Sequence, residues 1–515
     1  MSTVTYFVDF MIAICYNKLT ILLFQEGIMS KEKISAGSLA ADGIVPNRSL
    51  FAYAAGIAGQ NMHYGLISGW LFYFCNNVLK ISADAVGYIT GISRLWDSIN
   101  DPLIGALIDK HRFKNGEKLR PYLVGLPAII GILSLFMFKD WNLGSNAAVL
   151  YVLVCYLIWD VFYSMQDVAL WGMLALSSPR SEERARVAQW TAIGVTAGGA
   201  LAGIIPLAKD IAINNLGVTD KGFFLGAAVI LGLGGQLISM SAFKMKESVK
   251  EEKKEGESIF EAIFVLRHNR TLLVISLARI LEYIKLSVDW AYFFESQVFY
   301  KIGNLELGGG TVQFLYGLLS GAPGTFAQFA ATKIVNKIGG MKKTLILAQV
   351  SSIVIRIIGY FVGYNSAWKM LIVVVLIGLQ SIPAFMVNIA HRALMSDSID
   401  YVEYTTGKRT EGITFSMQNF ATKIGESLSL LIKGKLLTLV GYNQNIAMTA
   451  QNAVFMKWQW PMFILGPAVG AILYLCAIVF VKDDDEQRKM IEQELKLRRS
   501  KMVENAQTEL EQINK

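Results

Sequence analysis

Long apolar runs dominate the chain, and short polar segments separate them. Each run extends over about 20 residues or more, which is enough for a helix to cross about 30 Å of hydrocarbon. The pattern predicts an all-α polytopic membrane protein with twelve transmembrane helices. The expected spans cover residues 50–78, 83–108, 121–139, 147–177, 187–212, 222–243, 271–300, 311–336, 343–364, 368–396, 411–440 and 459–481.

The loop between the sixth and seventh spans is long and highly charged, and it divides the chain into two halves of six spans. The second span runs into "LIGALIDKHRFKNGEKLRP" and the eighth into "FAATKIVNKIGGMKKT", so each half repeats a basic turn with glycine after an apolar helix end. Such repeats are typical of secondary transporters built from parallel halves. The expected organisation is a lead-in at 1–49, a first half at 50–245, a cytoplasmic linker at 246–270, a second half at 271–481 and a charged cytosolic tail at 482–515.

Residues 1–28 do not fit this plan, because Asp9, Asn17 and Lys18 interrupt their apolar stretch. They predict either an extra N-terminal helix or a segment upstream of the true start. The second interpretation is favoured, since "MSKEK" from Met29 resembles a start followed by a polar lead-in.

Composition and charge support the membrane assignment and orient the helices. The chain has 515 residues, of which 53% are hydrophobic and 17% charged, with a net charge of +8; soluble domains carry about a quarter charged residues. Loops after even-numbered spans hold roughly 22 Lys and Arg, against about 7 after odd-numbered spans, so the even loops and both ends of the core are expected in the cytoplasm of a cell-membrane protein. The four cysteines lie in apolar runs without C-x-x-C spacing, which predicts small buried side chains rather than a zinc site or disulfides.

The second span carries charges within an otherwise apolar segment, "RLWDSINDPLIG". A charge at mid-bilayer costs about 2.5–3.5 kcal/mol on insertion scales, and such residues usually face the bundle interior. On a helix Asp97 and Asp101 lie about 40° apart, and Arg94 and Asn100 lie within about 60° of Asp97. Two carboxylates on one face can hold Na⁺ or share a proton. A structural ion pair between Arg94 and Asp97 is the alternative.

The fourth and eleventh spans also contain polar residues. Asp160 and Asp167 are both candidates in "LIWDVFYSMQDVALWGML", and Trp171 follows Asp167 at i+4. An acceptor beside a stacking ring suits a sugar, although a lone tryptophan more often packs. In the eleventh span Gln418 precedes Lys423, which would pair with the carboxylates of the second span or stabilise an anionic ligand.

In the seventh span Arg279, Glu282, Lys285 and Asp289 fall within roughly a 120° sector of a helix. This pattern predicts either the polar wall of a cavity or a set of inter-helix pairs. His63 in the first span is expected to line the cavity or to pack against neighbouring helices rather than to bind a metal, because no second histidine shares its span.

Three motifs in order resemble those of the glycoside–pentoside–hexuronide:cation symporter family of the major facilitator superfamily, which includes the melibiose permease and the glucuronide carriers. They are "SRLWDSINDPLIG" in the second span, "MSDSIDYVEYTTGKRTEG" after the tenth and "SMQNFATKIGE" in the eleventh. The similarity covers about residues 50–480. It implies a major facilitator fold and sugar import driven by Na⁺ or H⁺ through alternating access, with no cofactor besides the coupling ion.

The resemblance also implies site residues. Those for the cation are Asp97, Asp101, Asn100 and Ser164, with Na⁺ at Asp97 and Asp101 as one option. Those for the substrate are Asp167, Trp171, Asn61, Gln60, Lys423 and Gln418. Those for coupling and the cytoplasmic gate are Arg94, Asp397, Asp400, Glu403, Arg409 and Glu411.

One position departs from the melibiose permease, because Asn61 matches its second sugar-binding aspartate. An amide both donates and accepts, whereas a carboxylate only accepts, and the change removes a negative charge. This favours a hexuronide or pentoside over a galactoside. Arg279, Lys285 and Arg356 lie in or near spans and would suit an anionic sugar.

Other functions remain as alternatives. A lipid or lysolipid carrier of the same fold predicts a lateral apolar opening. A transporter-derived membrane sensor predicts a separate signalling domain, against which the short charged tail argues. An enzyme is least favoured, because no nucleophile–base or metal-ligand spacing is found. The expected partners are a small sugar, a monovalent cation and the bilayer, not nucleic acid, and the protein is expected to be a monomer.

Overall fold

The computed structural model describes residues 44–111, 113, 116–248, 269–338, 340–407, 411–481, 490–491 and 493–498. The expectations for residues 1–28, for Arg409 and for most of the linker and of the charged tail lie outside these described residues. In the tail, residues 490–491 and 493–498 are helical.

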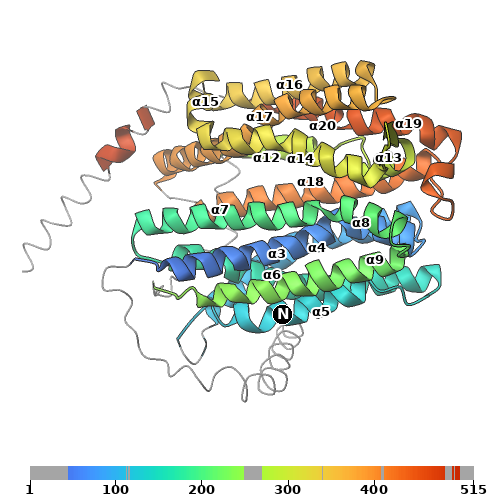
Figure 1. Ribbon diagram of the computed structural model, residues 1–515. Helices are drawn as coiled ribbons and strands as arrows, with labels where there is room; N and C mark the ends of the chain where they lie inside the picture. The colour runs from blue at the N-terminus through green and yellow to red at the C-terminus, as the bar shows by residue number, and fades with distance from the viewer. Residues whose placement is uncertain are drawn as a thin grey trace, which may run out of the picture.

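The first half consists of helical segments that follow its six apolar runs (Figure 1). They are α3 (Asn47–Tyr73) continued by η2 (Phe74–Val78), α4 (Ala83–Lys110), α5 (Tyr122–Met137), α6 (Ser145–Leu176), α7 (Ser181–Gly203) with α8 (Ile205–Asn214), and α9 (Asp220–Ala227) continued by η3 (Ala228–Leu233), α10 (Gly234–Ser239) and η4 (Met240–Lys244). The interruption between α7 and α8 coincides with Pro206, which has no amide hydrogen to continue the helical pattern.

The second half also follows six apolar runs and adds a short hairpin. Its elements are α12 (Arg270–Glu282), α13 (Trp290–Gln297), the antiparallel strands β1 (Tyr300–Ile302) and β2 (Leu305–Leu307), α14 (Gly309–Ala327), η5 (Gln328–Ala330), α15 (Ala331–Ile338), α16 (Met341–Val362), α17 (Ala367–Thr406), α18 (Glu411–Leu439), η6 (Met448–Ala450), α19 (Ala453–Ile464) and α20 (Gly466–Ile478). Within the described residues, helical segments therefore lie on all twelve predicted spans, and the all-α prediction is confirmed.

Not every segment would be recognised as a membrane span by length and hydropathy. Among the described residues five helical segments are long and apolar enough to cross a bilayer, and α19 with α20 makes a sixth if this pair, bent by 44°, counts as one span. α4 and α18 contain charged side chains, α5 has 16 residues, and a break separates α12 from α13. Of these elements, α4 and α18 pack against each other, so the charges that lower their mean hydropathy lie where the two halves meet.

The predicted continuous helix in the seventh span is wrong, because α12 ends at Glu282 and the chain stays non-helical until α13 begins at Trp290. The backbone of α20 approaches this stretch closely. A Cβ added to Gly466 would lie 2.2 Å from the carbonyl oxygen of Leu286, and one added to Gly470 would lie 2.3 Å from that of Glu282. The packing against α20 therefore requires glycine at both positions.

The tenth predicted span is also too short. α17 continues past residue 396 to Thr406 and ends at Gly407, which has a positive φ of 72° and suits a helix C-terminus. Asp397, Asp400 and Glu403, which the resemblance assigns to the gate, therefore lie on a helix and not in a loop.

α4 and α18 form the longest contact between the two halves (Figure 1). Their backbones approach at Gly87 and Gly434, where a Cβ on Gly87 would lie 3.1 Å from the Gly434 Cα. Further along, Ser427 Oγ donates to the Gly91 carbonyl at 2.7 Å. This packing brings the charged residues of both helices close together.

Other polar contacts between the halves gather near the end of the bundle that carries the loops after odd-numbered spans. Lys209 of α8 pairs with Glu295 of α13 at 2.8 Å, and the Tyr73 hydroxyl donates to the same carboxylate. Asp210 accepts from the Thr311 hydroxyl at 2.6 Å. These contacts hold the two halves together at that end.

Candidate functional site

The first cluster of charges lies on α4. Arg94 pairs with Asp97 at 3.1 Å, and Asp97 is 2% exposed. The other carboxylate oxygen, Oδ1, is buried and makes no hydrogen bond to the described residues. Arg94 also donates to the Tyr64 hydroxyl at 3.2 Å and lies 3.8 Å from Glu426 of α18. The Arg94–Asp97 pair, which was the alternative to a cation site, is therefore present, and it leaves one acceptor oxygen of Asp97 without a donor among the described residues.

Asp101 connects α4 with both α6 and α18. Its Oδ1 accepts from Ser164 Oγ at 2.7 Å, and its Oδ2 forms an ion pair with Lys423. The Lys423 ammonium also donates to the backbone oxygen of Asp97 at 3.2 Å. The structure thus brings together Asp101, Ser164 and Lys423, from three helices and both halves.

Asp160 of α6 adds a third carboxylate, which is buried as Asp97 is, and to which the sequence analysis assigned no role. It is 3% exposed and accepts from Asn100 Nδ2 at 2.9 Å. Asp97 and Asp101 both lie within electrostatic range of it. Its spacing of four residues from Ser164 places both on one face of α6, and this spacing was the available signal. Like charges gathered in this way favour a bound cation or proton.

A second polar group joins α3 and α6. Gln60 Nε2 donates to Asp167 Oδ1 at 2.6 Å and to the Tyr163 hydroxyl at 2.8 Å. Trp171 Nε1 donates to the same Asp167 oxygen at 3.1 Å, and Trp171 is 43% exposed. The group therefore combines an oriented carboxylate with an accessible aromatic face.

Asn61 takes a different direction from its neighbour. Its Nδ2 donates to the Ile57 carbonyl of its own helix at 2.9 Å and to Gln60 Oε1 at 3.2 Å. Gln60, and not Asn61, makes the direct contact with Asp167. Tyr163 was missed by the sequence analysis, because a tyrosine in an apolar span carries no distinctive signal.

The remaining predicted residues lie outside these two groups. Gln418 accepts from Ser276 of α12 at 3.3 Å. The gate residues Asp397, Asp400 and Glu403 are partly buried on the last turns of α17. Arg409 lies outside the described residues, as does the side chain of Glu411.

His63 lies within α3 beside the fourth span. Its Nε2 accepts from Trp159 Nε1 at 2.9 Å, so Nδ1 carries the hydrogen and donates to the Gly232 carbonyl at 3.1 Å. Both ring nitrogens are thus used in packing contacts. The expectation that the cysteines are buried fits Cys75, whereas Cys476 is exposed.

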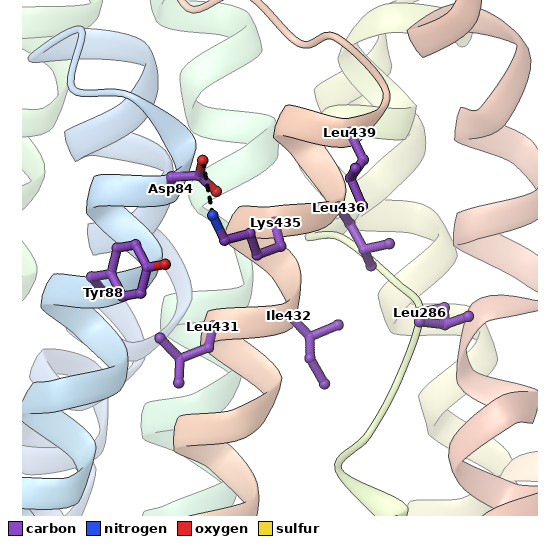
Figure 2. A pocket seen from close by; sticks show the side chains of 8 residues that line it. All are labelled: Asp84, Tyr88, Leu286, Leu431, Ile432, Lys435, Leu436 and Leu439. Carbon is purple, nitrogen blue, oxygen red and sulfur yellow. Dashed lines mark ion pairs between the residues drawn. The ribbon is translucent and has the colours of Figure 1, made fainter.

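An apolar groove of about 340 Å³ lies between α4 and α18 (Figure 2). It is lined by Asp84, Tyr88, Leu286, Leu431, Ile432, Lys435, Leu436 and Leu439. Its charged residues pair with each other, since Lys435 lies 3.3 Å from Asp84. Asp84 precedes Asp97 by 13 residues, or about 20 Å along a helix, so the groove is separate from the carboxylate cluster.

Two helical halves, whose opposite charges meet between α4 and α18 inside a membrane bundle, define a secondary transporter. The chain belongs to the MFS/sugar transport protein family, whose model matches residues 52–485. The resemblance drawn from the sequence motifs is thereby confirmed.

Individual relatives agree with this assignment. The chain is 28% identical over 457 residues to the uncharacterized symporter YjmB of Bacillus subtilis (strain 168), a match that covers 86% of this chain and 94% of the relative. It is 25% identical over 456 residues to the isoprimeverose transporter of Lactiplantibacillus pentosus, covering 87% and 91%. A crystal structure of a mutant of the nucleoside transporter NupG aligns with a TM-score of 0.57 at 15% identity, covering 85% of this chain and all of that one. The structural likeness shows the major facilitator fold.

Proposed function

We propose that this protein is a sugar:cation symporter, which imports a glycoside together with Na⁺ or H⁺ by alternating access. The observation that carries the proposal is Lys423, which reaches from the second half to pair with Asp101 in the first. A cation that binds Asp101 must compete with this lysine, so ion binding and the contact between the halves depend on one carboxylate. The symporter and the isoprimeverose transporter among the relatives support the same function.

The cation is assigned to Asp97, Asp101, Asn100 and Ser164. Carboxylate and hydroxyl oxygens suit a hard cation, and the same carboxylates accept a proton. No three His, Cys, Asp or Glu side chains in the described part of the chain form a metal-binding group, so Na⁺ would also need amide, backbone or water oxygens. Displacement of Lys423 by the cation would change the stability of one conformation relative to the other, which is the requirement for coupling.

The sugar is assigned to Asp167, Trp171 and Gln60, with Asn61 next to Gln60 on α3 and with Gln418 contributed by α18. The accessible Trp171 ring offers a stacking face, and Asp167 offers an acceptor for hydroxyl groups. Gln60 and the Trp171 nitrogen hold the Asp167 carboxylate in place. Because α3 contributes amides and no second carboxylate here, a hexuronide or a pentoside is favoured over a galactoside.

In the proposed cycle the halves at 50–245 and 271–481 rock about the central site of a monomer in the cell membrane. With the basic loops in the cytoplasm, the Lys209–Glu295 contact closes the outer end. Coupling and the inner gate are assigned to a set of charged residues. They are Arg94, Asp397, Asp400, Glu403, Arg409 and Glu411.

Gradient-driven uptake in membrane vesicles tests the proposal. Methyl β-glucuronide, methyl β-xyloside and methyl α-galactoside are each offered with a Na⁺ gradient and with a pH gradient. We expect one of the first two to accumulate above its external concentration under one gradient. If no sugar accumulates under either gradient, the symport proposal is wrong.

The groove between α4 and α18 is the observation that favours the second candidate, a lipid carrier. The substitution Leu436→Gln places an amide in the apolar groove and leaves the sugar-binding residues unchanged. Since substitutions away from a working site usually change free energies by no more than about 0.5 kcal/mol, we expect sugar accumulation to stay within about twofold of the unmodified protein. If the unmodified protein transports a fluorescent lysolipid and the Leu436→Gln variant does not, the result would instead support the lipid carrier.

A further inference from the structure

The break between α12 and α13 places non-helical backbone inside a predicted span. Such backbone is tolerated at membrane depth where protein covers it or where it lines a cavity, and broken helices often mark ligand sites in transporters. Protein covers part of this one, since the Leu286 amide donates to the Gly466 carbonyl at 3.2 Å. Figure 2 shows the chain around Leu286 as a stretch without helical turns near α18. The side chains around the break then decide whether it serves a ligand.

Ion pairs neutralise part of the charge around the break. Arg279 pairs with Glu282 at 2.7 Å, and Gln349 donates to the other oxygen of Glu282 at 3.1 Å. At the far end of the break, Asp289 pairs with Lys433 at 2.7 Å. Pairing of this kind is expected for charges within membrane spans.

Lys285 and Arg356 are different, because neither has a carboxylate partner within the described residues. Arg356 of α16 donates to Ser352 Oγ and to the Ile464 carbonyl, both at 3.2 Å. The Lys285 ammonium lies 5.3 Å from the centroid of the Tyr283 ring. Both side chains are partly buried, and they lie within electrostatic range of each other. The carboxylate that acts most strongly on Lys285, Glu282, is already paired with Arg279. Two neighbouring cations that form no ion pair of their own are costly at membrane depth, and an anionic ligand would offset that cost.

The break begins about as many residues into its helix as the sugar-binding residues proposed for the first half lie within theirs. Gln60 is 13 residues beyond Asn47, where α3 begins, and Glu282 is 12 residues beyond Arg270, where α12 begins. The break is connected to the cation cluster as well. The Tyr283 hydroxyl donates to a carboxylate oxygen of Glu426 at 3.4 Å, and Glu426 lies 3.8 Å from Arg94. A ligand between the halves would therefore reach both sides.

We propose that Lys285 and Arg356 bind the carboxylate of a hexuronide, which makes an anionic sugar the substrate of the symporter. The inference rests on the proposed function. Bidentate pairing with Arg and a point charge from Lys are the usual partners of a carboxylate.

The charged residues near the site are mainly acidic in the first half and mainly basic in the second. The first half contributes four aspartates against one arginine, and the second contributes five cations against three carboxylates. These are Asp97, Asp101, Asp160 and Asp167 against Arg94, and Arg279, Lys285, Arg356, Lys423 and Lys433 against Glu282, Asp289 and Glu426. A cation is attracted to the acidic half and an anionic group to the basic half. Binding of both would bring each half nearer to neutrality, whereas either ligand alone would do so for one half only.

The test compares methyl β-glucuronide with methyl β-glucoside and methyl β-xyloside, which lack the carboxylate. We expect Lys285→Gln and Arg356→Gln each to raise the KM for the glucuronide about tenfold or more, as for loss of a charge-assisted hydrogen bond. The KM values of any neutral sugar that is transported should change by less than about threefold, because the carboxylate contact is absent from them. Lys285→Arg should restore most of the glucuronide affinity, and Lys301→Gln, which removes an exposed lysine of the β1–β2 hairpin, is the matched control.

The outcomes separate this inference from the function on which it rests. If the unmodified protein accumulates the xyloside or glucoside but not the glucuronide, or if Lys285→Gln impairs all sugars equally, the inference is overturned and symport stands. If no sugar accumulates, the symport proposal fails. Thermal stabilisation of the purified protein by glucuronide then decides the inference: stabilisation lost in Lys285→Gln supports it, and no stabilisation of the unmodified protein overturns it.

Discussion

Replacing Asp101 with asparagine is expected to abolish gradient-driven sugar accumulation. The amide can keep the contact with Ser164, but it carries no charge, so the coupling cation loses a ligand and Lys423 loses its partner. Removing one member of a hydrogen-bonded charge pair costs about 2–5 kcal/mol, so we expect cation affinity to fall by at least about 30-fold. The measurement is uptake at increasing cation concentration, together with stabilisation of the purified protein by the cation.

A matched control exists on the same two helices. Asp84 pairs with Lys435 as Asp101 pairs with Lys423, but the Lys435 side chain is 54% exposed, and solvent-exposed pairs contribute little to stability. Asp84→Asn should therefore transport normally.

The double substitution Asp101→Asn with Lys423→Gln distinguishes a ligand from a structural pair. If Asp101 served only to neutralise Lys423, removing both charges would restore accumulation, because no unpaired charge would remain. If Asp101 binds the cation, the double variant stays inactive. Restored accumulation would therefore contradict the cation assignment.

The sequence was most informative where helices are continuous and polar residues recur at helical spacing. Arg94 and Asp97 are three residues apart on α4, and the ion pair that was the alternative to a cation site is present. The pairing of Lys423 with a carboxylate of the second span was one of the two alternatives that the sequence offered for this lysine, and it is the one present. In both cases the high cost of an isolated charge in a membrane leaves few arrangements for the side chain.

The break in the seventh span could not be predicted, because its cause lies about 180 residues away in the chain. The stretch from Tyr283 to Asp289 contains no proline or glycine. The glycines that allow the close approach, Gly466 and Gly470, belong to α20. Local sequence patterns do not contain tertiary contacts of this kind, so the four polar residues were assigned to a helix face that does not exist.

Gln60, and not Asn61, contacts Asp167, and the reason that the sequence did not show this is simpler. Neighbouring residues on a helix point about 100° apart, so a one-residue difference in an alignment changes the face that is assigned. Both are amides, and no pattern within α3 separates them. The contact of Gln60 with Asp167 depends on how α3 is rotated against α6, which is set by packing along the whole helix.

Replacing Asp167 with asparagine is expected to weaken sugar binding about 10- to 100-fold while leaving cation binding intact, since hydrogen bonds to charged groups contribute about 1.5–3 kcal/mol. Asp167 belongs to the Gln60 and Trp171 group, whereas the cation is assigned to the group around Asp101. The measurements are the sugar KM and stabilisation by cation alone, which should reach that of the unmodified protein. Because the variant keeps the Asp101–Lys423 group, saturating cation should still raise its sugar affinity, and sugar should raise its cation affinity by the same factor. Trp171→Phe keeps an aromatic face and should retain more affinity than Trp171→Ala. An Asp167→Asn variant that binds sugar normally but no longer responds to the cation would reverse the two assignments.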